Sequence, residues 1–143
     1  MNRRDAFVNS GAMLLAAASS AAMAEDMPHD HSHMHAASHD LLEATSDCVV
    51  KGQTCIAHCL MLLADGDKAM AACAKSVNQT IALCNALLSL AAQQSSLVPA
   101  LARVTMDACQ QCEKECRKHE KHVPCKDCAE ACAACTRECK AMI

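Results

Sequence analysis

The sequence predicts an all-α protein, an antiparallel up-down-up-down four-helix bundle with a cysteine-lined core. The 143-residue chain contains three Gly and three Pro, too few turn residues for a many-stranded β fold. Its thirteen Cys and its aliphatic residues recur at steps of three and four, the spacing of one helix face. Four such stretches are joined by short turns, and short connections make neighbouring helices antiparallel. Residues 38–143 are therefore expected to form one bundle domain.

Residues 1–24 are typical of an export signal. Arg3 and Arg4 precede an Ala- and Leu-rich stretch, and the closing Ala-Met-Ala matches the small-x-small pattern before a cleavage site. The paired arginines resemble a twin-arginine signal, although the usual Phe stands one place late, at Phe7. A general secretory signal is the alternative. The stretch is too short and too polar for a permanent anchor, so we expect a periplasmic protein without stable membrane insertion.

Residues 25–37 are rich in His and Met and show no apolar periodicity, so we expect a mobile tail. A solvated linker and a segment that captures metal both fit this composition. The first helix is then expected from Ser38 or His39 to Ala64, because the Asp-Gly-Asp turn that follows places a Gly where helices commonly end. The second helix follows over residues 68–94.

The third and fourth helices are predicted from their first turns. Ser95 or Ser96 is expected to cap the third helix, which carries Pro99 in its first turn and runs to about His119. The Val-Pro pair at 123–124 is expected to separate it from the fourth helix, over residues 125–142.

The cysteines of each predicted helix share one face, because steps of 3, 4, 7 and 11 residues all return to the same side of a helix. In chain order they are Cys48, Cys55 and Cys59; Cys73 and Cys84; Cys109, Cys112 and Cys116; and Cys125, Cys128, Cys132, Cys135 and Cys139. The charged residues of the last two helices lie off these faces. The sulfur should therefore point inward.

Antiparallel packing also predicts which cysteines share a depth. The first two helices each carry an 11-residue gap between cysteines, and the two gaps span equal lengths in opposite directions. One layer is expected to contain Cys48, Cys84, Cys109 and Cys139. The other is expected to contain Cys59, Cys73, Cys116 and either Cys125 or Cys128.

The two ends of the predicted bundle differ in composition. Beyond the first layer, six leucines form an apolar plug: Leu41, Leu42, Leu87, Leu88, Leu97 and Leu101. Beyond the second layer come five residues with metal-binding side chains: His58, Met61, Met70, His119 and His122. The leucine end should be closed, and the His/Met end has the composition of a metal entrance. His119 and His122 equally fit ordinary loop residues.

Thirteen buried thiols need a chemical reason, because replacing Leu by Cys gives up roughly 1 kcal/mol or more of apolar burial per site, at about 0.8 kcal/mol per CH₂. Soft thiolates select Cu(I), Zn(II) or iron–sulfur clusters. Zinc needs discrete groups of four ligands and iron–sulfur clusters commonly use Cys-rich loops, whereas straight helices offer pairs. Cu(I) accepts two or three thiolates, and one Cu(I) per thiolate leaves the core neutral. Multiple Cu(I) ions, about one per Cys, are therefore expected.

Other function classes fit the sequence less well. Cys pairs on one helix face have poor disulfide geometry, and an odd number of Cys leaves one unpaired. The formal net charge of −3 and the absence of a basic patch argue against nucleic acid. No Glu has a His three residues later, as di-iron bundles require, and no Cys–His pair stands out as a nucleophile. We therefore expect no enzymatic activity.

Taken together, these residues resemble the bacterial copper storage protein family. The resemblance is carried by the arginine leader, the segment 55–59 (Cys-Ile-Ala-His-Cys), Met70 with Cys73, Cys84, and the run from Cys109 to Cys139. It implies a homotetramer, copper bound by thiolates along the core, and copper uptake at the His/Met end, where Leu62 and Asp65 replace expected Met residues. In exported members, the copper is held for a membrane methane-oxidising enzyme.

The expected ligands are the thirteen cysteines with His58, Met61 and Met70 at the entrance. The expected function is storage and buffering of Cu(I), with supply to exported or membrane cuproenzymes through a copper-accepting enzyme or chaperone. Copper detoxification, or storage of another soft metal such as zinc, is the alternative.

Overall fold

The structure is a computed structural model that describes residues 32–143 of the chain. The predicted export signal and the first part of the predicted tail, residues 25–31, lie outside the described residues. Four α-helices account for most of the rest: α1 (Ser32–Ala64), α2 (Ala71–Ala92), α3 (Val98–Arg117) and α4 (Val123–Ala141). A short 3₁₀ turn, η1 (Lys68–Met70), precedes α2.

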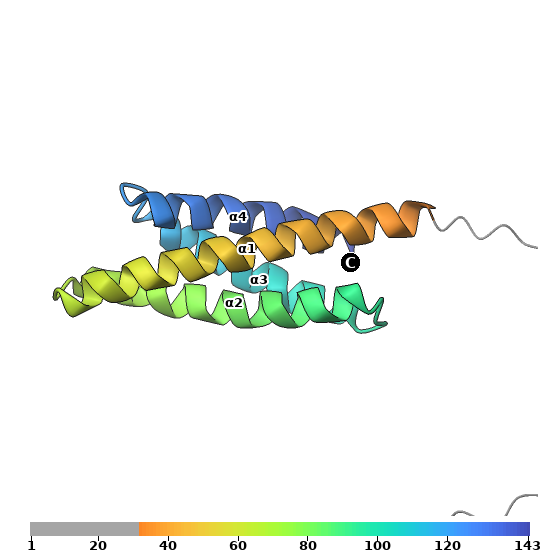
Figure 1. The fold of residues 1–143 in the computed structure, drawn as a ribbon, viewed down its shortest axis with the longest axis horizontal. Helices are drawn as coiled ribbons and strands as arrows, with labels where there is room; N and C mark the ends of the chain where they lie inside the picture. The colour runs from red at the N-terminus through yellow and green to blue at the C-terminus, as the bar shows by residue number, and fades with distance from the viewer. Residues whose placement is uncertain (1–31) are drawn as a thin grey trace, which may run out of the picture.

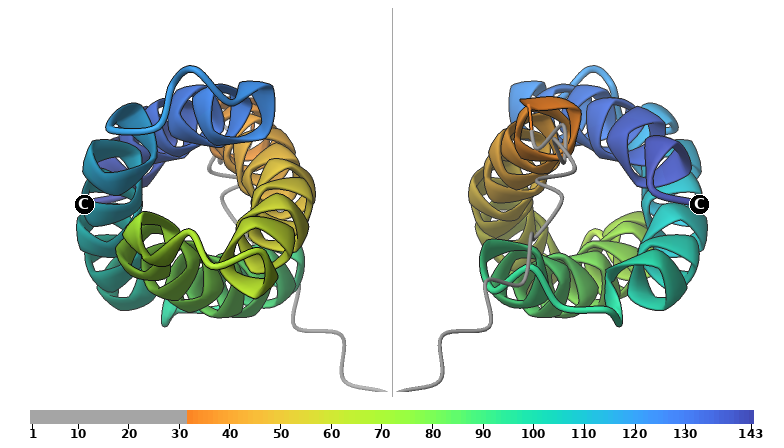
Figure 2. Two further views of the ribbon diagram at one scale, coloured as in Figure 1. Left: turned by 90° about the vertical axis from the view of Figure 1, so that its left-hand side faces the viewer. Right: turned by 90° about the vertical axis from the view of Figure 1, so that its right-hand side faces the viewer.

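The four helices run side by side along the long axis of the molecule (Figure 1). Viewed along that axis they form a ring, in which α1 packs against α2 and α4, and α3 packs against the same two helices (Figure 2). The α1–α2 and α3–α4 connections lie at one end and the α2–α3 connection at the other. The predicted antiparallel four-helix bundle is confirmed.

Local sequence explains where the helices begin and end. Gly66 adopts a left-handed conformation, with φ of 94°, directly after α1, as glycine does at helix ends. The side chain of Asp67 then accepts a hydrogen bond of 3.1 Å from the backbone N–H of Ala69 and so caps η1. Pro99 and Pro124 stand in the first turns of α3 and α4, where a missing N–H costs nothing.

Several predicted boundaries were wrong by a few residues. Helix α1 begins at Ser32, so its first turns occupy the second half of the predicted tail. The Val-Pro pair expected to precede the fourth helix instead opens it, because Pro fits the first turn of a helix as well as it fits a linker. The α3 N-cap is Leu97, without a side-chain cap; Ser95 Oγ accepts the Leu97 N–H at 3.2 Å.

One helix could be mistaken for a membrane span. The segment His39–Ala64 of α1 is long and apolar enough to cross a membrane by length and composition, with 22% of its most apolar stretch buried. In the bundle this helix packs against α2 and α4 through its cysteine-bearing face. Its apolar character therefore comes partly from the core face and partly from uncovered residues on the outside.

Candidate metal centre

All thirteen thiols point into the bundle, and each cysteine is at most 1% exposed. All thirteen are free. The cysteines of each helix lie in one stripe along its inner face. Helix α4 alone contributes five thiols at steps of three and four, and α3 contributes three. The inward direction predicted from the spacing is confirmed on every helix.

The sulfur atoms touch one another across helix boundaries and form one continuous array. The shortest contact joins Cys73 of α2 to Cys116 of α3, with 3.5 Å between the sulfurs. Cys59 lies 3.8 Å from the same Cys73, and Cys55 lies 3.8 Å from Cys125 of α4. Contacts of this length are hydrogen-bond distances between thiols, so each sulfur already has neighbours with which it could share a metal ion.

Four clusters of thiols are tight enough to hold metal, since all ligand atoms within a cluster lie within 4.8 Å of one another. They are Cys48, Cys84, Cys109 and Cys135; Cys55, Cys59, Cys73 and Cys125; Cys55, Cys116 and Cys128; and Cys112, Cys128 and Cys132. Two clusters contain four thiols, the number predicted for each layer, whereas the metal was predicted from pairs of thiols. Cys55 and Cys128 each belong to two clusters and so link three of them. The Cys48 cluster is joined to the others by the 3.8 Å contact between the sulfurs of Cys48 and Cys132, so the array is not divided into isolated sites.

The predicted layers are largely correct, with two corrections. Cys135 rather than Cys139 completes the layer with Cys48, because α4 is shifted along the axis by one helical turn from its expected position. Cys139 contacts Cys135 at 3.9 Å and lies one turn closer to the closed end. In the second layer, Cys116 touches Cys73 but clusters with Cys55 and Cys128.

The middle of the array is built mainly by α3 and α4, because the other two helices have a gap there. On α1 the stripe position between Cys48 and Cys55 is Gly52, and a Cβ at this position would lie 2.8 Å from Ile81 Cγ1. Ile81 and Val77 of α2 fill this level and are themselves buried. The glycine therefore allows α1 and α2 to approach closely where neither supplies sulfur.

Burial and mutual hydrogen bonding shift the thiol pKa values in opposite directions. Hydrogen bonds from Cys109 and Cys132 lower the pKa of Cys48 to about 5. Loss of solvent raises the pKa of Cys59 and Cys125, at the opposite end of the array, above the ordinary thiol range. Because many unpaired thiolates cannot be buried together, the array needs either protons or metal cations.

The end near the α1–α2 connection carries the predicted entrance residues. The rings of His58 and His122 face each other with 4.8 Å between their centroids, and the Nε2 atom of each is buried without a partner. Burial, followed by the nearby His58, lowers the pKa of His122 and so favours its neutral, metal-binding form. Met70 is fully buried beside the sulfur array, whereas Met61 is 61% exposed. His119 is half-buried.

The opposite end is closed, as predicted, but not by the six leucines alone. Leu41 and Leu87 are fully buried, and Leu42 and Leu101 pack against the core. Leu97 is 59% exposed, and the following residue, Val98, takes the buried position, because α3 begins there. Leu88 is half-buried.

Two threonines that the sequence reasoning missed are fully buried at this closed end. Thr45 stands three residues before Cys48, and Thr105 stands four residues before Cys109, so both continue cysteine stripes. Thr45 Oγ1 lies 3.9 Å from Cys135 Sγ. The stripe spacing could have identified them. His122 was placed near the entrance by the sequence but left out of the expected ligands, and its contact with His58 could not be predicted across two helices.

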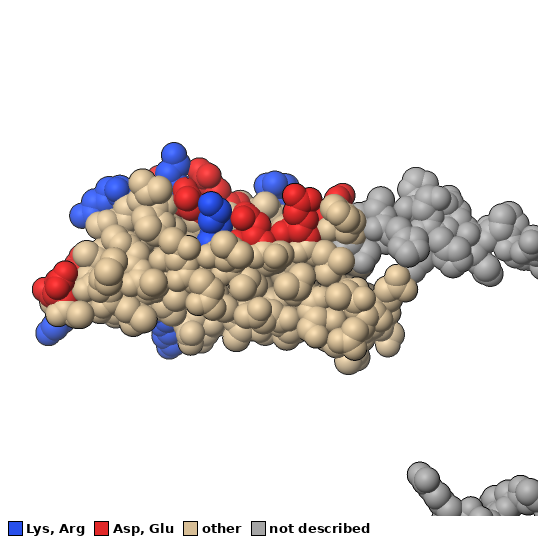
Figure 3. All heavy atoms as spheres, in the orientation of Figure 1, with Lys and Arg blue, Asp and Glu red and all other residues tan. Residues whose placement is uncertain are grey.

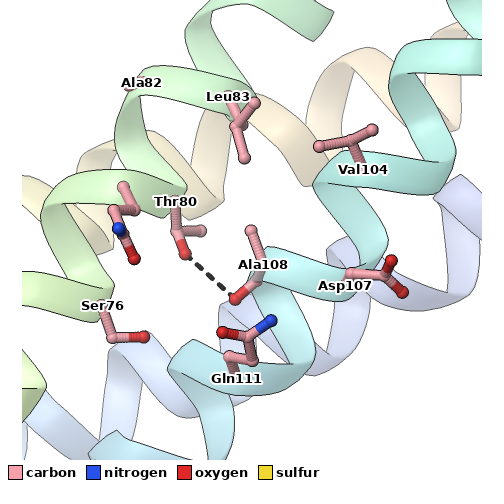
Figure 4. Close-up of a pocket in the computed structure, with 9 residues that line it drawn as sticks. Ser76, Thr80, Ala82, Leu83, Val104, Asp107, Ala108 and Gln111 are labelled. Atoms are coloured by element: carbon pink, nitrogen blue, oxygen red, sulfur yellow. Dashed lines mark hydrogen bonds between the residues drawn. The ribbon is translucent and has the colours of Figure 1, made fainter.

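A surface groove of about 510 Å³ lies outside the bundle, between α2 and α3 (Figure 4). Its lining includes Ser76, Val104 and Gln111 and contains no cysteine. Within it, the Thr80 hydroxyl donates a 3.2 Å hydrogen bond to the carbonyl of Ala108. The groove therefore has no part in the thiol chemistry, and the candidate metal centre is the interior array.

The comparisons with known proteins agree with this geometry. The model of the family described as copper storage protein (Csp) matches residues 34–143. Among solved structures, the chain is similar to the Cu(I)-bound copper storage protein BsCsp3, with 25% sequence identity and a TM-score of 0.66. That similarity covers 74% of this chain and 97% of the other. No curated protein sequence matches the chain.

Proposed function

The chain belongs to the copper storage protein family, and from that premise we propose that it stores many Cu(I) ions on the thiolates of its core. The observation that carries this function is the continuous array of thirteen buried, free thiols. Soft, d¹⁰ Cu(I) is the ion that such a ligand set favours. The similar solved structure, which is Cu(I)-bound, supports the same choice of metal.

Charge balance sets the capacity of the proposed store. Each Cu(I) that replaces a thiol proton leaves the buried array neutral, so the whole array can be loaded at about one copper per Cys, on the order of a dozen per chain. Zinc, the alternative soft metal, fits less well. A Zn²⁺ ion on one of the four-thiol clusters would leave two net negative charges buried for every ion bound.

The His/Met end supplies the proposed route for copper. His58 and His122 offer unpartnered ring nitrogens, and Met70 offers a fully buried thioether three residues before Cys73. A neutral imidazole binds copper, and a thioether suits Cu(I) in particular. Met61 points to solvent and would act only before copper reaches these residues. At the leucine-filled end, Leu41 and Leu87 are fully buried instead.

Storage rather than catalysis is the proposed role because no single thiol has surroundings that set it apart as a nucleophile. Each cysteine is buried with sulfur neighbours, and none is exposed beside a general base, the arrangement that activates a nucleophilic thiol. The described surface groove is lined by no cysteine and holds no cluster of titratable side chains. We therefore assign no catalytic residue.

A homotetramer is the proposed assembly, supported by an uncharged face on α1 and α2. From Gly52 to Ala64 α1 has no Asp, Glu, Lys or Arg, and Lys75 is the one such residue in α2. Val50 and Leu60 are exposed on this side, and Figure 3 shows it nearly free of charge, whereas Lys, Arg, Asp and Glu gather along α4. An uncharged face with exposed aliphatic side chains supports an interface between copies at this place.

The cellular setting is also part of the proposal. The twin-arginine-like leader supports export to the periplasm after folding in the reducing cytosol, which would keep the thiols free. Supply of copper to exported or membrane enzymes and detoxification of excess copper would use the same ligands. The accepting enzyme or chaperone is the partner that a supply role requires.

An anaerobic titration tests the proposed function. Cu(I) is added to the reduced protein in the presence of a competing chromogenic chelator, and helicity is followed by circular dichroism. We expect about a dozen equivalents per chain to bind ahead of the chelator while helicity persists. Saturation after one or two equivalents would exclude storage, and stronger binding of Zn²⁺ than of Cu(I) would favour the alternative metal.

A further inference from the structure

The closed end of the thiol array contains a polar feature that storage alone does not explain. Thr45 and Thr105 are both 0% exposed, and Leu41 and Ala102, one turn before them on the same helices, are buried as well. Valine has nearly the same shape as threonine and no polar atom. A hydroxyl in such surroundings destabilises the fold unless it forms a hydrogen bond.

Neither threonine has an oxygen partner for its hydroxyl. Helical threonines ordinarily bond a backbone carbonyl in the preceding turn, and Thr54 does so, donating to the Val50 carbonyl at 3.2 Å. Thr105 Oγ1 is buried without a hydrogen-bond partner among the described residues. Thr45 Oγ1 has one, the sulfur of Cys135, at 3.9 Å. Both hydroxyls can therefore donate to acceptors other than the backbone.

The register of the bundle shows which acceptors those are. Thr45 and Thr105 lie one turn toward the closed end from Cys48 and Cys109, because α1 and α3 run in the same direction. Cys139 lies one turn beyond Cys135 on α4, which runs the opposite way, so it reaches the same level. This last thiol belongs to none of the tight clusters, and its sulfur contact is Cys135, at 3.9 Å.

We propose that Thr45 and Thr105 cap the closed end of the array by donating hydrogen bonds to the copper-bound thiolates of Cys135 and Cys139. This inference rests on the proposed function. When Cu(I) displaces the thiol protons, which leave to solvent, the sulfurs become acceptors only. Both hydroxyls can then act as donors, and hydrogen bonds to a charged acceptor are the stronger kind. The Cys135–Cys139 pair thereby becomes the most retentive copper site of the chain.

The pair of threonines is tested with the double variant Thr45→Val/Thr105→Val. Its control is Thr54→Val, since Thr54 is exposed on α1 and donates to the Val50 carbonyl, away from the thiol array. Loaded proteins are stripped anaerobically with increasing chelator, and the copper count per chain is read by native mass spectrometry. The unfolding temperature of each metal-free protein is measured in parallel.

We expect two changes of opposite sign. The metal-free double variant should unfold at a higher temperature than the wild type, because unsatisfied hydroxyls are removed. Its last retained copper should nevertheless be released at a chelator concentration about tenfold lower, the loss expected for a hydrogen bond to a charged sulfur. Thr45→Ser/Thr105→Ser, which keeps the hydroxyls, should restore retention. A purely structural role would move stability and leave the final copper unaffected.

Equal retention of the last copper by the wild type, the double valine variant and the Thr54→Val control would overturn the proposal. If the double variant fails to fold, Thr105→Val alone carries the same comparison, because its hydroxyl has no partner to lose. A wild-type protein that binds only one or two coppers is a different result. It would overturn the storage function itself and the cap with it.

Discussion

At the scale of single residues, the chemistry of this protein was readable from the sequence because it depends on one residue type. The thirteen cysteines recur at helical steps, so those of each helix share one face and turn inward as a set. Each of them is buried in the structure. What spacing could not give was the contact of one helix with another. The facing rings of His58 and His122 depend on how α1 meets the turn before α4, and no local pattern encodes that distance.

Replacing both histidines should slow copper uptake without reducing capacity. His58→Ala/His122→Ala removes two unpartnered ring nitrogens at the open end but leaves all thirteen thiols in place. The rate of Cu(I) transfer from a weak chelator is measured by stopped-flow absorbance, with His39→Ala, an exposed histidine at the other end, as the control. An unchanged rate, or a lower final copper count, would contradict an entrance role.

Copper binding should weaken as the pH falls. Burial raises the pKa of Cys59 and Cys125, so both are protonated near neutral pH and each must lose a proton to bind copper. Affinity at such thiols should fall by up to about tenfold per pH unit for each proton displaced, since lower pH favours the competing proton. At Cys48, whose pKa is about 5, protons should compete with copper only near and below that pH. Chelator competition between pH 6 and 9 measures the slope, and a flat profile would contradict it.

At the scale of elements, helix identity was predictable and helix ends were less so. The period of the apolar and sulfur positions identified all four helices, since it persists over many turns. The ends depend on single residues that fit two roles. Pro124 suits a linker and a first helical turn equally, and Ser95 bonds Leu97 without being the N-cap. Composition alone could not show that α1 begins at Ser32.

The close approach of α1 and α2 at Gly52 should depend on the absence of a side chain. Gly52→Ala places a Cβ 2.8 Å from Ile81 Cγ1, and overpacking of this kind costs about 1–3 kcal/mol, against about 1 kcal/mol gained in helix propensity. We expect a net loss of stability in chemical denaturation. In an Ile81→Ala background, the same change should be neutral or stabilising. Additive effects of the two substitutions on the free energy of unfolding would show that the contact with Ile81 is not the cause of the loss.

At the scale of the whole molecule, the architecture followed from the short connections, but the axial register did not. Equal gaps between cysteines located both thiol layers, yet α4 is displaced by one turn, so Cys135 replaces Cys139. Rise per residue fixes lengths within a helix, whereas the offset between helices depends on how their side chains interlock. The offset decides which cysteine of α4 completes the cluster with Cys48.

Self-association should depend on the uncharged α1/α2 face. Val50→Glu/Leu60→Glu introduces two charges where the exposed surface of α1 has apolar side chains, and we expect it to convert a tetramer into smaller species. Val123→Glu, which changes an exposed valine at the start of α4, is the matched control. Analytical ultracentrifugation reads the mass. A monomeric wild type, or dissociation of the control as well, would contradict this placement of the interface.

The central claim is that copper lies along the axis of the bundle, between the sulfur atoms. Anomalous diffraction at the copper edge, from crystals of the fully loaded protein, tests it most directly. We predict a row of copper peaks that extends from the level of Cys59 and Cys125 to that of Cys135 and Cys139. Peaks confined to surface histidines, or one or two isolated ions in an otherwise metal-free core, would contradict the account.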